Sequence, residues 1–193
     1  ISNLEYGILL NVTTNNTIIN ATIRGVTYGV FLNNTQNTTF VNSTVANSTS
    51  TALSVWGNSS RFNNFTYSSF VSSKGNAANI SGSFNQFNNT NFTAGLNGPD
   101  PDAVVVIYGN ADSNNFTFAT VNNTGNEDNS ASAIAFFGSN NTKVEKSVLK
   151  GGRGGSGYGF AFWEGDNGNT SILNNTIIGN GLGSSGGIGV RVA

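Results

Sequence analysis

The chain lacks cysteine, methionine and histidine altogether, and it contains only two prolines. Without cysteine it has no disulfide scaffold, no thiolate metal site and no cysteine nucleophile. Charge is also scarce, because Asp, Glu, Lys and Arg make up 9% of the residues and the formal net charge is -1. So little positive charge leaves no surface field to attract DNA, RNA or an anionic membrane, and we expect no nucleic-acid partner.

Long apolar runs are missing as well, since none approaches the roughly 18 residues that cross a bilayer, so we expect no membrane insertion. The chain begins at Ile1 rather than Met, as a processed mature protein or an excised fragment would. Hydrophobic residues make up 37% of its 193 residues. That is enough for one sizeable core, and it predicts a single domain over residues 1–193.

A short apolar motif returns along the chain at steps of about 22 to 29 residues, the spacing typical of solenoid repeats. Within it apolar residues alternate, as in Ile8 with Leu10 and Ile134 with Phe136, which predicts strands with one buried face. The copies are "YGILLN" from Tyr6, "YGVFLN" from Tyr28, "ALSVWG" from Ala52, "ANISGS" from Ala78, "VVVIYG" from Val104, "AIAFFG" from Ala133, "GFAFWE" from Gly159 and "GIGVRV" from Gly187.

A second motif follows the copies of the first and carries an apolar pair five residues apart, such as Phe40 and Val45 in "FVNSTV". Its other copies begin at Ile18, Phe65, Phe87, Phe116, Val144 and Ile172. Such short strands bury a core only when each copy lies on the previous one. The two motifs therefore predict an all-β parallel β-helix of about seven to eight rungs, on the order of 36 Å long.

Asparagine recurs at the middle of the second motif, at Asn20, Asn42, Asn89 and Asn174. We expect a stacked turn there, because Asn tolerates the left-handed backbone and its amide can hydrogen-bond to the rungs above and below.

The stretch "NTSILNNTIIGNG" from Asn169, with its echo "NNTIINATI" from Asn15, resembles the right-handed parallel β-helix repeat of pectin-lyase-like proteins and of archaeal cell-surface and sheath proteins. The resemblance covers nearly the whole chain and implies a right-handed coil. It implies little about function, because this architecture hosts lyases, glycosidases, adhesins and inert coats.

Enzymes of that family carry acids, or acids with Arg and Lys, along the outer face of one strand column. The corresponding positions here are not ionisable, so we predict no catalytic residues. They are Leu9, Phe31, Ser54, Val106, Ala135, Ala161 and Gly189.

The carboxylates fall in connections between strands. Asp100, Asp102, Glu127 and Asp128 could offer oxygens to Ca²⁺ from adjacent rungs, but their spacing matches no calcium motif, so a solvated acidic loop is the favoured interpretation. Glu164 and Asp166 could form an acid and base pair, but nothing evident separates their pKa values.

An aromatic strip is predicted on one outer face, where Tyr108, Phe137 and Trp163 should stack in three successive rungs. Exposed aromatic strips mark subunit contacts or sugar platforms. Alternatively, the loop "LNGPDPD" from Leu96 folds over the strip, which is then ordinary core.

Asn-x-Ser/Thr sequons are dense and favour a secreted, N-glycosylated protein. We expect sugars on Asn15, Asn37 and Asn169 and none on Asn20, Asn42 and Asn174, which belong to the turn. Sequons begin at Asn11, Asn15, Asn20, Asn33, Asn37, Asn42, Asn47, Asn58, Asn64, Asn79, Asn88, Asn91, Asn115, Asn122, Asn140, Asn169 and Asn174.

Both ends of the repeat array lack an atypical capping segment, so Ile8 and Leu10 at one end and Ile188 and Val190 at the other should join copies end to end. These features favour a structural subunit of an extracellular sheath, filament or surface layer that binds copies of itself and needs no cofactor. The alternatives are a carbohydrate-binding or adhesive module that uses the aromatic strip and, third, a polysaccharide lyase or hydrolase.

Overall fold

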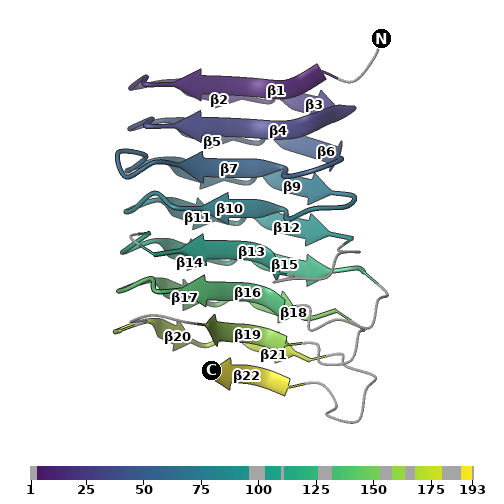
Figure 1. The fold of residues 1–193 in the computed structure, drawn as a ribbon, viewed down its shortest axis with the longest axis vertical. Coiled ribbons are helices and arrows are strands. Elements are labelled where there is room, and N and C mark those ends of the chain that lie inside the picture. Colours follow the sequence, from purple (N-terminus) through teal and green to yellow (C-terminus); the bar gives the residue numbers. More distant parts are fainter. Residues whose placement is uncertain are drawn as a thin grey trace.

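The protein is a right-handed parallel β-solenoid in the computed structural model (Figure 1). The structure describes residues 4–95, 103–109, 111–125, 132–152, 158–163, 168–179 and 188–192, and for 163 and 188–192 the backbone only. In Figure 1, β1 (Leu4–Asn11) crosses the front of the coil, and β2 (Thr17–Ile19) and β3 (Thr22–Arg24) return behind it before the next rung begins. The fold class is therefore as the sequence predicts, and the right-handed coil is as the resemblance implies.

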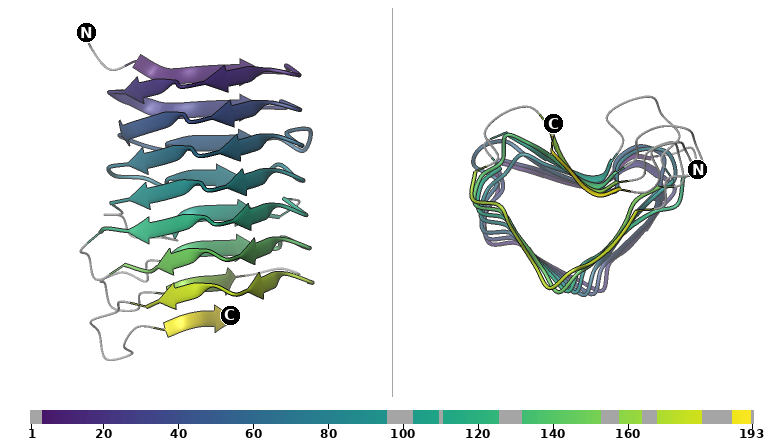
Figure 2. Two further views of the ribbon diagram at one scale, coloured as in Figure 1. Left: turned by 180° about the vertical axis from the view of Figure 1, so that it is seen from behind. Right: turned by 90° about the horizontal axis from the view of Figure 1, so that it is seen from below.

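Three parallel sheets form the sides of the coil, and their outline is roughly triangular when the rod is seen along its axis (Figure 2). Sheet I contains β1, β4 (Val26–Asn33), β7 (Leu53–Trp56), β10 (Ala78–Ile80), β13 (Ala103–Tyr108), β16 (Ser132–Phe137), β19 (Tyr158–Trp163) and β22 (Ile188–Val192), in that order. Sheet II contains β2, β5 (Thr39–Val41), β8 (Asn64–Thr66), β11 (Gln86–Asn88), β14 (Asn115–Thr117), β17 (Lys143–Glu145) and β20 (Ser171–Leu173). Sheet III contains β3, β6 (Thr44–Ser48), β9 (Ser69–Ser72), β12 (Asn91–Ala94), β15 (Thr120–Asn123), β18 (Val148–Lys150) and β21 (Thr176–Ile178).

The core is a column of apolar side chains that face inward from all three sheets. Sheet I supplies the alternating residues of the first motif, such as Val105 and Ile107, and sheets II and III supply the pair of the second motif, such as Phe40 and Val45. All four are at most 1% exposed. Phenylalanine rings also stack along the axis, with Phe87 and Phe116 4.5 Å apart between centroids. The inward assignment of both motifs is confirmed for the copies whose side chains the structure describes.

A sharp bend within the longer strands of sheet I places two consecutive residues toward the core, as in Ala133 and Ile134 of β16. The room at the first of the two differs between rungs: at Gly29 an added Cβ would collide with the carbonyl of Ala52 and the side chain of Val45, whereas Val104 fills the same position in a later rung. Residues before this bend lie on the outer side, where Tyr6 contacts the outward-facing Phe31 edge to face.

Two further corners, on either side of sheet II, each place one residue per rung in the left-handed region, with φ between 49° and 59°. The entry corner lies two residues before each strand of sheet II and comprises Asn15, Asn37, Phe62, Phe84, Ser113, Asn141 and Asn169. The exit corner follows each of these strands directly and comprises Asn20, Asn42, Tyr67, Asn89, Phe118, Lys146 and Asn174. The stacked turn predicted at Asn20, Asn42, Asn89 and Asn174 is the exit corner.

The predicted hydrogen-bonded ladder is found at the exit corner between Asn42 Nδ2 and Asn20 Oδ1, at 2.8 Å. Tyr67, Phe118 and Lys146 interrupt it in later rungs. A longer ladder, which the sequence analysis missed, lies inside the entry corner.

The register of the last strand differs from the prediction by two residues. Aligning "GIGVRV" with "GFAFWE" pairs Ile188 with Phe160, whereas β22 pairs Val190 with Phe160 and Ile188 with Tyr158. The segment before β22 consists mostly of Gly and Ser, with Leu182 as its one apolar residue, and the alternating residues of "GIGVRV" fit two registers. Ile188 therefore corresponds to a residue before the bend rather than to the first core position of its rung.

Candidate functional site

The predicted aromatic strip lies on the outer side of sheet I. The register pairs Tyr108 with Phe137 and Phe137 with Trp163. The rings of Tyr108 and Phe137 stack with centroids 6.0 Å apart, while the side chain of Trp163 lies outside the described residues. Partial burial raises the pKa of Tyr108 above its usual 10.0.

Trp56 extends the aromatic strip, although the sequence analysis did not assign this residue to it. Its ring meets that of Tyr108 edge to face with centroids 6.3 Å apart, although one rung separates them. The contact is possible because that rung carries the small Ser81 at the same position. Trp56 is 50% exposed and Tyr108 36%, so this part of the strip is open to solvent.

The part of sheet I beside the strip is covered. Ala103, Val106 and Ala135 form a second apolar cluster with Phe137 packed against it, and all three are at most 1% exposed although they face away from the main core. Phe137 is thus partly a core residue, which agrees with the alternative in which a loop covers the strip. The loop named for that role, residues 96–102, lies outside the described residues.

The first rung leaves its core residues partly open. Ile8, Leu10, Ile18 and Ile23 pack on the core but are only partly buried. Their counterparts one rung further are Val30, Leu32, Phe40 and Val45, and these are at most 1% exposed. Strand β1 pairs only with β4, so the backbone groups along its other edge have no strand partner among the described residues.

At the opposite end of the described structure, Ile172 and Ile177 are core residues that remain partly buried, in β20 and β21, the last described strands of sheets II and III. Sheet I has one further described strand, β22, which places Val192 beside the partly buried Phe162. Of the residues predicted to join copies, Ile8 and Leu10 have this position, whereas the side chains of Ile188 and Val190 lie outside the described residues.

The two sets of predicted glycosylation positions lie at different corners but are equally accessible. Asn15, Asn37 and Asn169 lie at the entry corner, and Asn20, Asn42 and Asn174 at the exit corner. All six are exposed. Exposure alone therefore does not separate them, and the hydrogen bond from Asn42 to Asn20 is the structural difference that remains.

The acidic residues considered for Ca²⁺ or for acid–base chemistry lie outside the described residues: Asp100, Asp102, Glu127, Asp128, Glu164 and Asp166. Among the residues that the structure does describe, no group of three or more potential metal ligands occurs. Lys143 and Glu145 form an ion pair of 2.8 Å on sheet II, and the hydrogen bond from Lys143 lowers the pKa of Glu145.

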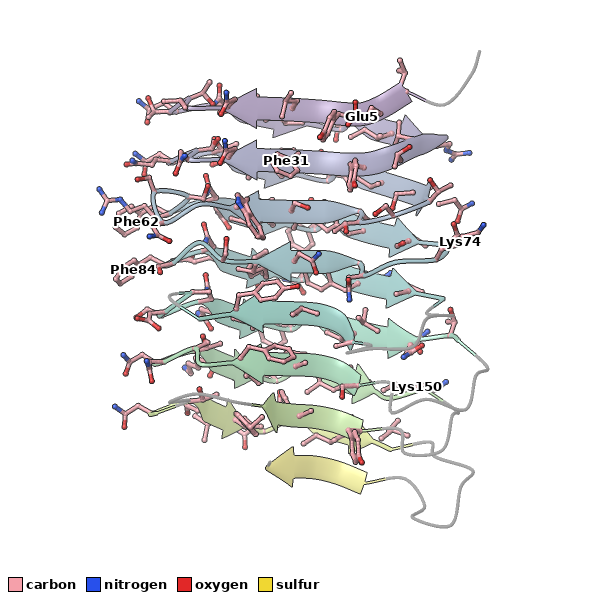
Figure 3. All side chains as sticks on the ribbon, in the orientation of Figure 1. Glu5, Phe31, Phe62, Lys74, Phe84 and Lys150 are labelled. Atoms are coloured by element: carbon pink, nitrogen blue, oxygen red, sulfur yellow. The ribbon has the colours of Figure 1, made fainter. Side chains whose placement is uncertain are left out.

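Four exposed aromatic residues at the corners escaped the sequence analysis: Phe62 and Phe84 at the entry corner, and Tyr67 and Phe118 at the exit corner. Figure 3 shows Phe62 and Phe84 projecting outward from successive rungs. A usable signal was present, because aligning the repeats rung by rung puts these residues in columns otherwise rich in Asn.

No protein-family model matches the chain, and no curated protein matches it. In the part of the chain that the structure describes there is no helix with the length and apolarity to span a membrane.

Proposed function

We propose that the protein is a structural, non-enzymatic subunit of an extracellular sheath, filament or surface layer that assembles by end-to-end stacking of β-solenoids. The observation that carries this proposal is the first described rung, where Ile8 and Leu10 are only partly buried and the outer edge of β1 has no strand partner among the described residues. An open rung exposes apolar core and unpaired backbone groups together, and both are covered when another strand is added.

A second copy of the chain is the partner that fits this end. At its other end the outermost described strand is β22 in sheet I, and the outermost described core residues of sheets II and III are the partly buried Ile172 and Ile177, which belong to the same core column as the first rung. A contact between unlike ends does not close by two-fold symmetry, so repeated addition yields a filament or a ring. The open part of the strip, Trp56 and Tyr108, then contributes lateral contacts between rods.

An extracellular, cell-surface location belongs to the same proposal. It rests on the density of sequons and on the low charge, which attached glycans and surface hydroxyls would offset in keeping the protein soluble. The resemblance to repeats of archaeal sheath and other cell-surface proteins points the same way.

Introducing charged side chains into the first rung tests the proposal. At a chain concentration on the order of 100 μM, which is far above a micromolar Kd, light scattering should show polymer. Ile8→Lys combined with Leu10→Lys should leave a folded but monomeric or short species, because it places two ammonium groups at the junction.

Leu9→Lys is the matched control, since Leu9 lies between them on β1 and is exposed on the outer side. It should polymerise as the parent does. A parent chain that stays monomeric under these conditions, with circular dichroism showing intact strands, refutes the stacking proposal.

A carbohydrate-binding module is the second candidate, and the ring contact between Trp56 and Tyr108 favours it because this pair is half exposed. Glycan-array binding by the soluble monomer, lost in Trp56→Ser, would support it over the structural role.

A further inference from the structure

The outer face of sheet II lies between the entry and exit corners, and in its middle rungs both corners carry aromatic residues. Phe62 precedes β8 and Tyr67 follows it, Phe84 precedes β11, and Phe118 follows β14. The three strands are consecutive in the sheet. Four aromatic side chains therefore surround one patch of the solenoid surface.

The backbone conformation of these four residues is unfavourable for their side chains. Their φ values run from 51° to 58°, in the left-handed region, where a bulky side chain is strained and Asn is tolerated. Asn occupies the same columns in the first two rungs and in the last, at Asn15, Asn37, Asn169 and their exit-corner counterparts. The fold thus accepts Asn at these corners without requiring an aromatic ring.

Burial does not compensate for this strain, because the four side chains remain between 46% and 64% exposed. Phe62 and Phe84 gain a stacking contact of 5.4 Å with one another. Among the described residues Tyr67 has no ring neighbour, and Phe118 is contacted by the Lys146 ammonium at 5.4 Å from its centroid. Strained, exposed residues of this kind accumulate where they serve a ligand.

A groove lies directly beside Phe118 on the same face. Its lining comprises Gln86, Phe87, Asn88, Asn115, Thr117 and Phe118. The Oδ1 atom of Asn115 accepts a hydrogen bond from Thr117 at 3.2 Å, and the amide NH₂ of this groove-lining residue is a further donor. The exposed amide of Gln86 adds a donor and an acceptor.

The groove itself is uncharged, because no residue that lines it is ionisable. Of the charged residues around it, Lys143 and Glu145 form an ion pair of 2.8 Å, while Arg61 and Lys146 lie over the rings of Phe62 and Phe118. A ligand with many hydroxyl groups suits the uncharged groove, whose amides can donate to and accept from them.

We infer that the outer face of sheet II is a binding site for a neutral polysaccharide, with sugar rings stacked on Tyr67 and Phe118 and sugar hydroxyls bonded to Gln86, Asn88 and Asn115. Sugar rings carry apolar C–H faces that pack on aromatic rings, and their hydroxyls exchange hydrogen bonds with side-chain amides. Tyr67 and Phe118 are two rungs apart, which is on the order of 10 Å along the axis. A glycan strand that runs parallel to the rod meets both.

Substitution by Asn distinguishes a binding role from a structural one, because it should relieve backbone strain and at the same time weaken binding. Tyr67→Asn with Phe118→Asn restores the residue that the column holds in other rungs. The double variant should melt at the same temperature as the parent or higher, since left-handed strain is relieved. Its affinity should fall at least tenfold, since both stacking surfaces are gone.

Isothermal titration calorimetry with uncharged hexasaccharides of glucose, mannose and xylose measures the affinity, and we expect at least one to bind with a Kd below about 1 mM. Val12→Asn is the matched control, because Val12 also has a positive φ of 52° and is exposed. It directly follows β1 of sheet I and belongs to neither corner of sheet II, so this variant should bind as the parent does.

Three outcomes overturn the inference: no hexasaccharide binds at several millimolar, only acidic oligosaccharides bind, or the double variant binds as the parent does. A lower melting temperature in the double variant, together with unchanged binding, would make the aromatic residues structural. The assay uses soluble monomer and reads affinity alone, so its result is independent of end-to-end assembly.

Peptide mass spectrometry of the native protein provides a second test. Asn88 and Asn115 begin sequons and line the groove, so the inference requires both to be unmodified. Glycans on both residues would fill the site and contradict it.

Discussion

Asn63 and Asn85 lie in successive rungs, and the Nδ2 atom of Asn63 donates to Oδ1 of Asn85 at 3.0 Å while both side chains are fully buried. Asn85 in turn donates to Asn114 Oδ1 at 3.2 Å, and the backbone N–H of Asn63 also bonds to Asn85 at 3.0 Å. Buried amides are stabilising only when their partners are all present. This ladder holds the entry corner of the three middle rungs together.

Asn85→Ala should therefore lower the free energy of unfolding by about 3–5 kcal/mol, because it removes the acceptor of the Asn63 backbone N–H and amide and the donor to the buried Ser60 carbonyl. Chemical denaturation measures the change. Asn88→Ala is the control, since Asn88 is exposed on the neighbouring strand, and its effect should stay within about 0.5 kcal/mol. Equal effects of the two substitutions would show that the ladder contributes nothing.

The sequence predicts the solenoid because its signal is periodic and redundant: each rung repeats the same inward pair, so a weak copy such as "ANISGS" is aligned by its neighbours. The corners are harder to predict. Asn63, Asn85 and Asn114 are buried and Asn88 is exposed, yet all four stand in similar polar sequence. What separates them is the direction of the chain at a corner, which composition does not encode.

The last strand and the candidate site show the limits of pattern reading in the same way. The register of β22 was missed by two residues because no bulky residue anchors it. Trp56 was left out of the strip because its contact with Tyr108 crosses a rung. Stacking between adjacent rungs is readable from aligned repeats, whereas a contact over a small residue needs side-chain size and direction.

Val12 offers a test of the left-handed corners. It is a β-branched residue with φ 52°, it is 72% exposed, and Asn34 holds the equivalent corner in the next rung. Val12→Asn should stabilise the protein by about 1 kcal/mol, because strain is relieved and no core contact is lost. Ile19→Asn, at an exposed strand position, should not stabilise it. A destabilised Val12→Asn variant in thermal melts would contradict the account of the corners.

Tyr108 should make the stability of the folded protein depend on pH in the alkaline range. Burial raises its pKa in the folded state above 10.0. Its contribution to stability is complete below the unfolded pKa near 10 and is lost as the pH rises through the folded value. Thermal melts from about pH 8 to 11 should show a loss that is smaller in Tyr108→Phe. Identical pH profiles for the two proteins would place the Tyr108 hydroxyl in water.

Glycosylation should follow the corners. Asn15, Asn37 and Asn169 should carry sugars, whereas Asn20, Asn42 and Asn174 should stay bare, because a sugar on Asn42 would break its hydrogen bond of 2.8 Å to Asn20. Mass spectrometry of glycopeptides from native material measures occupancy at each position. Sugars found on the exit-corner residues and absent from the entry-corner residues would reverse the assignment.

Electron microscopy of the assembled native protein tests end-to-end stacking most directly. Sheet I contains eight strands, and strands in a sheet lie about 4.8 Å apart, so a filament that continues this sheet from copy to copy has an axial repeat of about 38 Å. The account predicts rods with that repeat and with a meridional spacing of about 4.8 Å. Separate particles at concentrations on the order of 100 μM, or rods whose repeat bears no relation to the strand count, would contradict it.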